Sequence, residues 1–323
     1  MKIPTVIHNG FSFVTVNKPT TQDIRFLNET FGFSLLNLED YLYKTQIPKI
    51  ETYSDYTLVV MDTPYIQQQA KTKKEQRISF PIHSKVTRRK RITVGEVDFF
   101  IGKDYLVVLH DDRTPQIDEL FEMCKLSDKN RSDFMGKGPA YLFYRIADTL
   151  VDASMSYVDD ITNTIDFIDR QLEDSRSSSV IEDISMTRRN IVVFETMIKP
   201  TLPIFADLEK GKYAKLSNNM TQYWSNILDH LQKIWDRLED NKELIEGISR
   251  SHESLVSTRT NEIIKVLTIF TAILLPLTLL ASVYGMNVQL PFEHSAGAFF
   301  ILMVIMFGLA VLMIFFFKLR EWL

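Results

Sequence analysis

The sequence is short of several features that would each point to one class of protein. It contains a single cysteine, Cys124, among 323 residues, so it cannot form an internal disulfide and fits a reducing compartment. Its N-terminal stretch, MKIPTVIHNG, lacks the apolar run of a signal peptide. A formal net charge of −4 gives no general attraction to nucleic acid, which is not an expected partner. We therefore expect the N-terminal bulk of the chain to lie in the cytoplasm.

Signatures of catalysis are also missing. The sequence has no phosphate-binding loop, no nucleophile elbow and no zinc-protease motif. Its six histidines follow no spacing typical of metal ligands. These absences predict a protein that is not an enzyme and that carries no covalent cofactor.

Charge is absent from two long stretches near the C-terminus. Residues 266–292 and 296–317 contain no charged side chain and are rich in Leu, Ile, Val and Phe. A helix needs roughly 20 apolar residues to cross the hydrocarbon core of a bilayer. The two stretches therefore predict a multi-pass protein of the cell (inner) membrane, in contact with lipid. A buried hairpin in a soluble protein is the less favoured alternative.

The flanking charges predict the orientation of the two spans. Arg259 and Lys265 precede the first span, and Lys318 and Arg320 follow the second. The short connector 285–295 has neither Lys nor Arg. Because basic residues collect on the cytoplasmic side, both termini are expected in the cytoplasm and the connector outside.

Polar side chains recur along one face of the first span and not of the second. Steps of three and four residues form one helical stripe of Asn261, Ile264, Thr268, Thr271, Leu275, Thr278 and Ser282. Such hydroxyls can bond a carbonyl one turn back and then face lipid at small cost. Alternatively the stripe lines a water-filled cavity, which is the interpretation we favour.

Upstream of the spans, the chain predicts an α/β (α+β) cytoplasmic domain. Runs rich in β-branched and aromatic residues predict strands at 11–16, 56–62, 91–94, 97–102 and 105–111. Helical spacing appears at 21–31 and 115–125, and two long helices over 138–211 are broken near 175–180. The expected regions are the cytoplasmic domain 1–126, a long-helix coiled-coil or stalk region 127–260, a first transmembrane helix 261–284, an extracytoplasmic loop 285–295, a second transmembrane helix 296–317 and a basic cytoplasmic tail 318–323.

A heptad pattern leads into the first span. Apolar residues alternate at steps of three and four over Met220, Trp224, Ile227, Leu231, Ile234, Leu238, Ile245, Ile248 and Leu255, skipping Asn241 and His252. No proline interrupts residues 217–274, so one helix is expected to run from the cytoplasm into the membrane. Since two spans per chain cannot enclose an aqueous path, a pore requires several copies in a ring. The heptad helix is an expected means of assembly.

Four segments of the chain resemble the CorA magnesium channel family. YGMN (284–287) follows the first span, TNEIIKVLT (260–268) enters it, and PLT (276–278) lies within it. The cytoplasmic segment LEDYLYKTQIPKIE (38–51) is also similar. The resemblance implies a funnel-shaped homopentamer in which a long stalk helix becomes the inner, pore-lining span. It implies import of Mg²⁺, and of Co²⁺ or Ni²⁺, down the membrane potential.

The resemblance also assigns residues to the pore. A selectivity filter is implied at Gly285, Met286 and Asn287, with an Asn287 ring facing the hydrated ion and Tyr284 bracing the mouth. Family pore-facing positions match Asn261, Leu267, Thr271, Leu275, Thr278 and Ser282. Glu293 in the connector is either a ring that concentrates cations or an ordinary solvated carboxylate, because the connector LPFEH departs from the family pattern.

A regulatory cation site is implied in the cytoplasmic part, with Mg²⁺ as its ligand. Glu39 and Asp40 match an acidic pair that binds Mg²⁺ between subunits and holds the channel shut. Asn226 stands where the partner aspartate is expected, and Asp229 follows one turn later. We expect weaker Mg²⁺ feedback or a site displaced toward Asp229. Alternatively, Glu39 and Asp40 are plain exposed residues.

Two other functions remain open from the sequence. A zinc transporter of the same superfamily also has Gly and Asn at the mouth, although its connector is usually glycine-rich. A membrane-anchored cytoplasmic sensor without transport belongs to a different class. Flux of competing cations into proteoliposomes separates these alternatives, because an anchor conducts nothing.

Overall fold

The computed structural model describes residues 3–43, 46–67, 90–173, 180–286, 296–320 and 322. The chain divides into two compact units, residues 1–248 and 249–323. The first unit is a layered domain of sheet and helices, and the second consists of apolar helices.

A six-stranded mixed sheet forms the centre of the first unit. Its strands are β1 (Thr5–His8), β2 (Phe11–Asn17), β3 (Lys49–Thr52), β4 (Thr57–Gln67), β5 (Arg91–Ile101) and β6 (Tyr105–His110). Their order is β1-β2-β6-β5-β4-β3, and all neighbours are antiparallel except β2 and β6. The five predicted strand runs all lie in this sheet. Two of them, 91–94 and 97–102, form the single strand β5, because β4 pairs with it without interruption through Gly95.

Strand β4 contains a proline that the pairing accommodates. Pro64 lies beyond the part of β4 that pairs with β3, which ends at Lys49 opposite Val60. The β3 side of Pro64 is therefore an edge, and its missing N–H costs no ladder hydrogen bond.

The described part of the chain contains nine helices. They are α1 (Thr21–Phe31), α2 (Leu35–Tyr43), α3 (Pro115–Leu126), α4 (Asp128–Met135), α5 (Pro139–Glu173), α6 (Val180–Glu209), α7 (Ala214–Ser217), α8 (Thr221–Tyr284) and α9 (Ala296–Leu319). Thr20 begins α1 with a capping box, since its hydroxyl accepts from the N–H of Asp23 and its own N–H donates to the Asp23 carboxylate. The two long helices predicted over 138–211 are α5 and α6.

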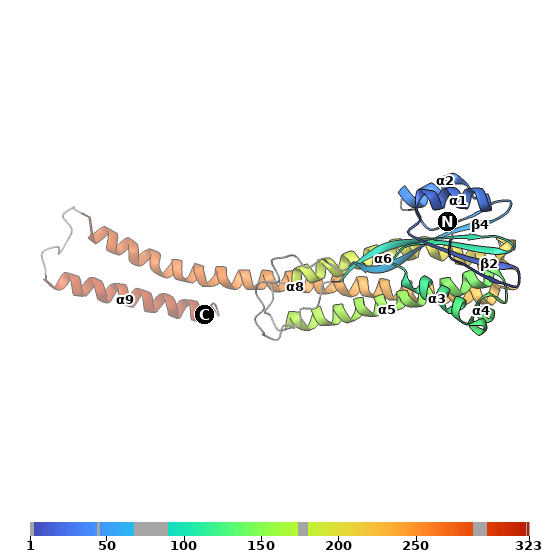
Figure 1. Ribbon diagram of the computed structural model, residues 1–323. Coiled ribbons are helices and arrows are strands. Elements are labelled where there is room, and N and C mark those ends of the chain that lie inside the picture. The colour runs from blue at the N-terminus through green and yellow to red at the C-terminus, as the bar shows by residue number, and fades with distance from the viewer. Residues whose placement is uncertain are drawn as a thin grey trace. The chain divides into compact units, whose positions relative to one another are not determined.

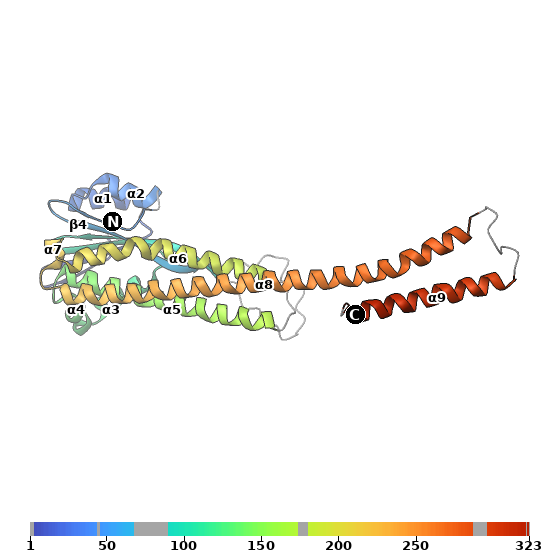
Figure 2. The same ribbon diagram turned by 180° about the vertical axis from the view of Figure 1, so that it is seen from behind.

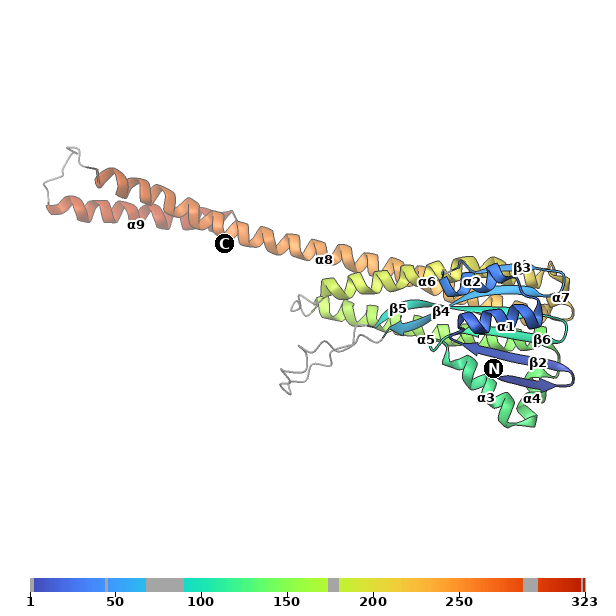
Figure 3. The ribbon, with the colours of Figure 1, turned by 45° about the horizontal axis from the view of Figure 1, so that its top comes forward.

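The two faces of the sheet bury two separate cores. Helices α1 and α2 cover one face, while α3 to α8 cover the other (Figure 1, Figure 3). Side chains alternate between the faces along each strand, so Phe99 joins the larger core and Phe100 the smaller one. Phe13 and Val14 on β2 divide in the same way. The sheet therefore separates everything carried by α2 from everything carried by α5 and α8.

The heptad seam of α8 packs within its own chain. Its apolar positions from Met220 to Ile248 are buried, and α5, α6 and α8 run side by side (Figure 2). Trp224 lies at the centre, with ring centroids 5.5 Å from Phe143 of α5 and 6.1 Å from Phe205 of α6. From Met220 to Ile248 this seam is filled by α5 and α6 of the same chain, so a role of α8 in assembly stays a prediction. Leu255 departs from the seam and is 51% exposed.

Helix α8 continues without interruption for 64 residues. At 1.5 Å per residue it spans about 96 Å. The predicted continuity from the heptad region into the first apolar span is confirmed. Pro276 lies inside the helix and removes one internal hydrogen bond there.

Candidate functional site

The C-terminal part of α8 is an apolar helix with almost no covering. Its apolar stretch has a mean hydropathy of 2.3 with 6% of it buried, and Phe299–Leu319 of α9 reach 3.0 with none buried. Leu267 and Leu275 are 65% and 69% exposed. Apolar surface on this scale is unstable in water, so lipid or further copies of the chain must cover it.

The threonines of the polar stripe satisfy their own hydrogens inside the helix. Thr268 donates to the carbonyl of Ile264 at 2.8 Å, Thr271 to that of Leu267 at 2.9 Å, and Thr278 to that of Leu274 at 2.8 Å. Each hydroxyl oxygen keeps lone pairs that can accept further hydrogen bonds. All of the stripe residues, from Asn261 to Ser282, are exposed. These three threonines therefore offer acceptors rather than donors, which suits the outward-pointing hydrogens of water bound to a cation.

The end of α8 places the first residues of the predicted filter. Gly285 donates its N–H to the carbonyls of Ala281 at 3.0 Å and Ser282 at 3.2 Å, and Met286 donates to that of Val283 at 3.3 Å. A Cβ on Gly285 would lie 3.2 Å from the Ala281 oxygen, so this tight last turn favours glycine. Tyr284 and Met286 are exposed. Asn287 and Glu293 lie outside the described residues.

The predicted regulatory carboxylates do not meet within one chain. Glu39 is exposed and Asp40 half-buried on α2, while Asp229 is exposed on α8. The sheet and both of its cores lie between these two helices. An ion bound jointly by these groups would therefore need α2 from one chain and α8 from another.

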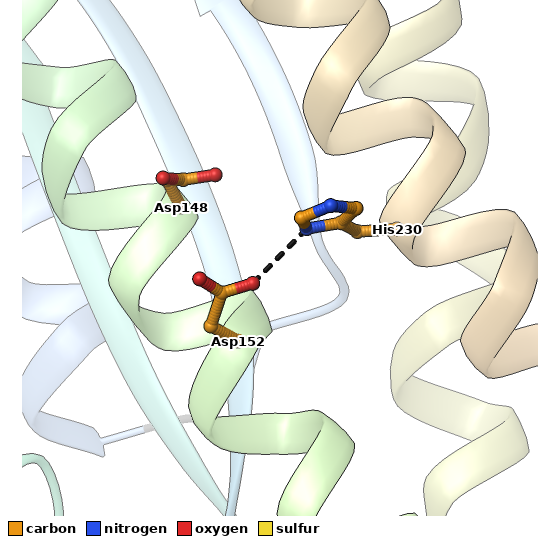
Figure 4. A group of neighbouring side chains, drawn as sticks. All are labelled: Asp148, Asp152 and His230. Atoms are coloured by element: carbon orange, nitrogen blue, oxygen red, sulfur yellow. Dashed lines mark hydrogen bonds and ion pairs between the residues drawn. The ribbon is translucent and has the colours of Figure 1, made fainter.

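A different group of ligands comes together between α5 and α8 (Figure 4). One ligand atom from each of Asp148, Asp152 and His230 lies within 4.8 Å of the others. His230 Nδ1 is 3.0 Å from Asp152 Oδ1, and Asn226 Nδ2 donates to Asp148 Oδ1 at 3.1 Å. Burial, followed by the charge of Asp152, raises the pKa of Asp148 above its ordinary value. An imidazole with two carboxylates suits Co²⁺, Ni²⁺ or Zn²⁺ better than Mg²⁺, which prefers oxygen alone.

Sequence reasoning missed this group. Asp148 and Asp152 are four residues apart on one helix, and Asn226 and His230 are four apart on another. The spacing puts each pair on one face. The meeting of the two faces depends on helix packing between segments 78 residues apart, which the sequence pattern does not reveal.

Known proteins are similar to this chain over nearly its whole length. The sequence model of the family described as CorA-like Mg²⁺ transporter protein matches residues 8–319. The cobalt/magnesium transport protein CorA of Thermotoga maritima is 25% identical over 305 residues, covering 94% of this chain and 80% of its own. The putative metal ion transporter YfjQ of Bacillus subtilis is 26% identical, covering 94% and 87%.

A solved structure of a known transporter shares the fold of this chain. The CorA magnesium transporter of Methanocaldococcus jannaschii has a TM-score of 0.77 at 17% identity, covering 97% of this chain and 92% of its own. The alignment includes both the sheet domain and the apolar helices, so the long α8 and the following α9 are shared features of the fold. With the family match spanning residues 8–319, the chain belongs to the family of CorA-like Mg²⁺ transporters.

Proposed function

We propose that the protein is a homopentameric channel that imports Mg²⁺, with Co²⁺ and Ni²⁺ as further cargo. The observation that carries this proposal is the stripe of back-bonded threonines on an exposed apolar helix. In a ring of α8 helices, these oxygens face the axis and accept hydrogen bonds from the ion's own waters. Stripping Mg²⁺ of its water is costly, so a path that accepts the hydrated ion conducts best.

The second apolar helix has a different role. Helix α9 is apolar on all sides, which suits a position toward lipid outside the α8 ring. The exposed Leu267 and Leu275 project from α8 within the span. Repeated around an axis, rings of leucine form apolar constrictions that close the path by expelling water.

A selectivity filter at the outer mouth follows the last turn of α8. Gly285 ends α8 with a tight turn, and the next two residues are Met286 and Asn287. A ring of Asn287 carbonyl oxygens would bind the outer waters of the cation without the grip of a full carboxylate. Tyr284 braces this mouth, and Glu293 raises the local cation concentration. Weak binding lets the ion leave again, as conduction requires.

The membrane potential supplies the driving force. Moving one charge through 100 mV releases about 2.3 kcal/mol, and so about 4.6 kcal/mol for a divalent ion. In this account the protein lies in the inner membrane, and both termini and the sheet domain lie in the cytoplasm, which the imported ion enters. The charges Arg259 and Lys318 at the inner ends of the spans support that orientation.

A cytoplasmic cation regulates the channel from the space between subunits. Glu39 and Asp40 on α2 of one subunit face α8 of its neighbour, near Asp229. The chain has Asn226 rather than a carboxylate at the expected partner position, and Asn226 donates to Asp148. The carboxyl groups of α8 and α5 at this place are therefore Asp229 and Asp148.

Flux into proteoliposomes tests the proposal. Purified protein is reconstituted with an inside-negative potential, and entry of Mg²⁺, Co²⁺ and Zn²⁺ is measured separately and in competition. We expect Mg²⁺ flux that is abolished by Asn287→Ala and retained by Gln289→Ala, an amide two residues further along the connector. Absence of flux for every cation would leave a membrane-anchored sensor, and a preference for Zn²⁺ would replace the proposed cargo.

A further inference from the structure

A group of carboxyl side chains lies on the face of the sheet that α1 and α2 cover. Asp62 on β4 is directly opposite Glu96 on β5, and Asp98 follows two residues along β5. Alternation places all three on the face of Val60 and Phe100, which belong to the smaller core. Three acidic groups therefore share one surface with a hydrophobic core.

Some of the carboxylate oxygens are buried without a partner. Asp98 is 0% exposed, and its Oδ1, like Oδ1 of Asp62, forms no hydrogen bond with any residue that the structure describes. Gln46 reaches the group: its backbone N–H donates to Glu96 Oε2 at 2.7 Å. Its side-chain amide nitrogen is 3.3 Å from Glu96 Oε1 and 3.5 Å from Asp98 Oδ2. A single side-chain amide thus serves two carboxyl groups, and among the described residues Oδ1 of Asp62 and Oδ1 of Asp98 have no donor.

The described cations around this group are already paired elsewhere. Asp40 on α2 and Lys49 on β3 interact with its carboxyl groups, and Glu96 and Asp98 interact with Tyr41 on α2, which also interacts with Asp111 and Arg113 after β6. Lys49 Nζ is 2.9 Å from Glu51, and Arg113 Nε is 2.6 Å from Asp111. Among the described residues, the cations near the group therefore do not neutralise three ionised carboxyl groups.

Burial and mutual repulsion both oppose ionisation here. Like charges at directly opposite strand positions destabilise a sheet, and an unpaired buried carboxylate costs far more. Burial is the largest cause for each group, and it raises the pKa of Asp62 to about 7 and the pKa values of Glu96 and Asp98 above their ordinary range. A proton is the smallest positive charge that can be added, and it turns one acceptor oxygen into a donor.

We propose that Asp62, Glu96 and Asp98 form a proton-binding site, which holds at least one proton at neutral pH and releases it as the pH rises. Release adds negative charge below α2, where Asp40 lies. This consequence rests on the proposed function, because it assumes that α2 binds the regulatory cation. One extra charge about 10 Å from a divalent ion in a water-like dielectric strengthens its binding by about fourfold. The cation that closes the channel should therefore bind more tightly at higher pH.

Infrared spectroscopy of the full-length protein in detergent tests the site itself. A protonated carboxyl gives a carbonyl stretching band that is separate from the bands of ionised carboxylates. We expect this band at about pH 7 in the wild type and its loss toward about pH 9. It should weaken in Asp62→Asn and in Asp98→Asn, while exposed Asp229→Asn should leave it unchanged. No band at neutral pH, or a band that neither variant alters, would overturn the proposal.

Further variants and a flux measurement test the proposal if one variant does not fold. If Asp98→Asn does not fold, the titration of the wild-type band and the Glu96→Gln variant still report on the site. Inhibition of flux by internal Mg²⁺ is then compared at about pH 6 and about pH 8, where we expect about fourfold tighter inhibition at the higher pH, and none of this shift in Asp98→Asn. If the infrared band titrates as expected but inhibition by Mg²⁺ does not change with pH, only the link to α2 is rejected. If the infrared band is normal but no cation enters the proteoliposomes, only the proposed function is rejected.

Discussion

The two halves of α8 are one helix with opposite surroundings. The heptad side chains from Trp224 to Ile245 are buried by α5 and α6, whereas from Asn261 to Tyr284 most side chains are exposed and only Ile269 is buried. The polar groups of the two halves also differ in their hydrogen-bond partners. In the first half the amide of Asn241 is buried and bonds Thr162 at 3.0 Å, and in the second half threonines bond only their own helix. The same helix thus contributes to a buried core in its first half and has an exposed surface in its second half.

This contrast separates residues that act within one chain from residues that need several. A substitution in the buried half should lower the stability of a single subunit. A substitution in the exposed half should leave the folded domain intact and change only what the assembled ring does. Four predictions follow this division, from the largest effect to the smallest.

Trp224→Ala should give the largest loss of stability. The ring is fully buried between Phe143 and Phe205, and its indole N–H donates to the carbonyl of Leu216 at 3.1 Å. Removing such a side chain costs about 3–5 kcal/mol through lost contacts and an empty cavity. Urea unfolding of the purified protein, followed by circular dichroism, measures the effect. Leu275→Ala in the same helix is the control, and an equal loss there would erase the contrast between the halves.

Thr278→Val should reduce flux by about tenfold while leaving the stability of the first unit unchanged. The substitution keeps the shape and removes an acceptor worth about 1.4 kcal/mol to the water of a passing ion. Thr278→Ser keeps the oxygen and should conduct nearly normally. Thr258 makes the same bond to its own helix at 3.0 Å outside the apolar stretch, so Thr258→Val is the matched control. Equal flux in all four proteins would remove the hydroxyls from the conduction path.

Binding of Co²⁺ or Ni²⁺ at Asp148, Asp152 and His230 should strengthen as the pH rises. The raised pKa of Asp148 means that a proton competes with the metal up to a higher pH than for an ordinary aspartate. Where one proton is displaced, affinity rises about tenfold per pH unit. Calorimetric titration at several pH values measures this slope, which Asp148→Asn should flatten. A slope unchanged in that variant would mean that the ions bind elsewhere.

Leu255→Ala should have the smallest effect, below about 0.5 kcal/mol in a single folded chain. The residue continues the heptad pattern but is half exposed. Size-exclusion chromatography with light scattering reports its role in assembly alongside the unfolding measurement. A normal monomer stability with a disrupted oligomer would show that the seam becomes an interface between chains at this position.

The sequence predicted the strands, the long helices and the two apolar spans because these depend on local periodicity. Trp224 and Ile245 repeat at helical spacing, and Phe99 and Phe100 lie in a strand-like apolar run. The same periodicity did not identify the partner of the heptad seam. A seam looks alike whether its partner is another chain or, as here, α5 and α6.

Sites built across distant segments were beyond sequence pattern alone. Asp62 meets Glu96 only because β4 and β5 pair in one register, and a shift of one residue would have turned one of them to the other face. His230 meets Asp152 through helix packing. The polar stripe could be identified because a stripe on a single helix is a local property, and the pore-lining role of its residues remains a prediction.

Cysteine accessibility along α8 tests the central claim that the stripe lines a water-filled path. The only native cysteine, Cys124, is buried, so introduced cysteines can be read with little background. In the reconstituted protein, a membrane-impermeant thiol reagent should modify Thr271→Cys and Thr278→Cys, and it should block flux. Ile273→Cys and Leu280→Cys lie about half a turn away and should not react. Equal labelling on both faces, or labelling of the 273 and 280 positions alone, would contradict the account.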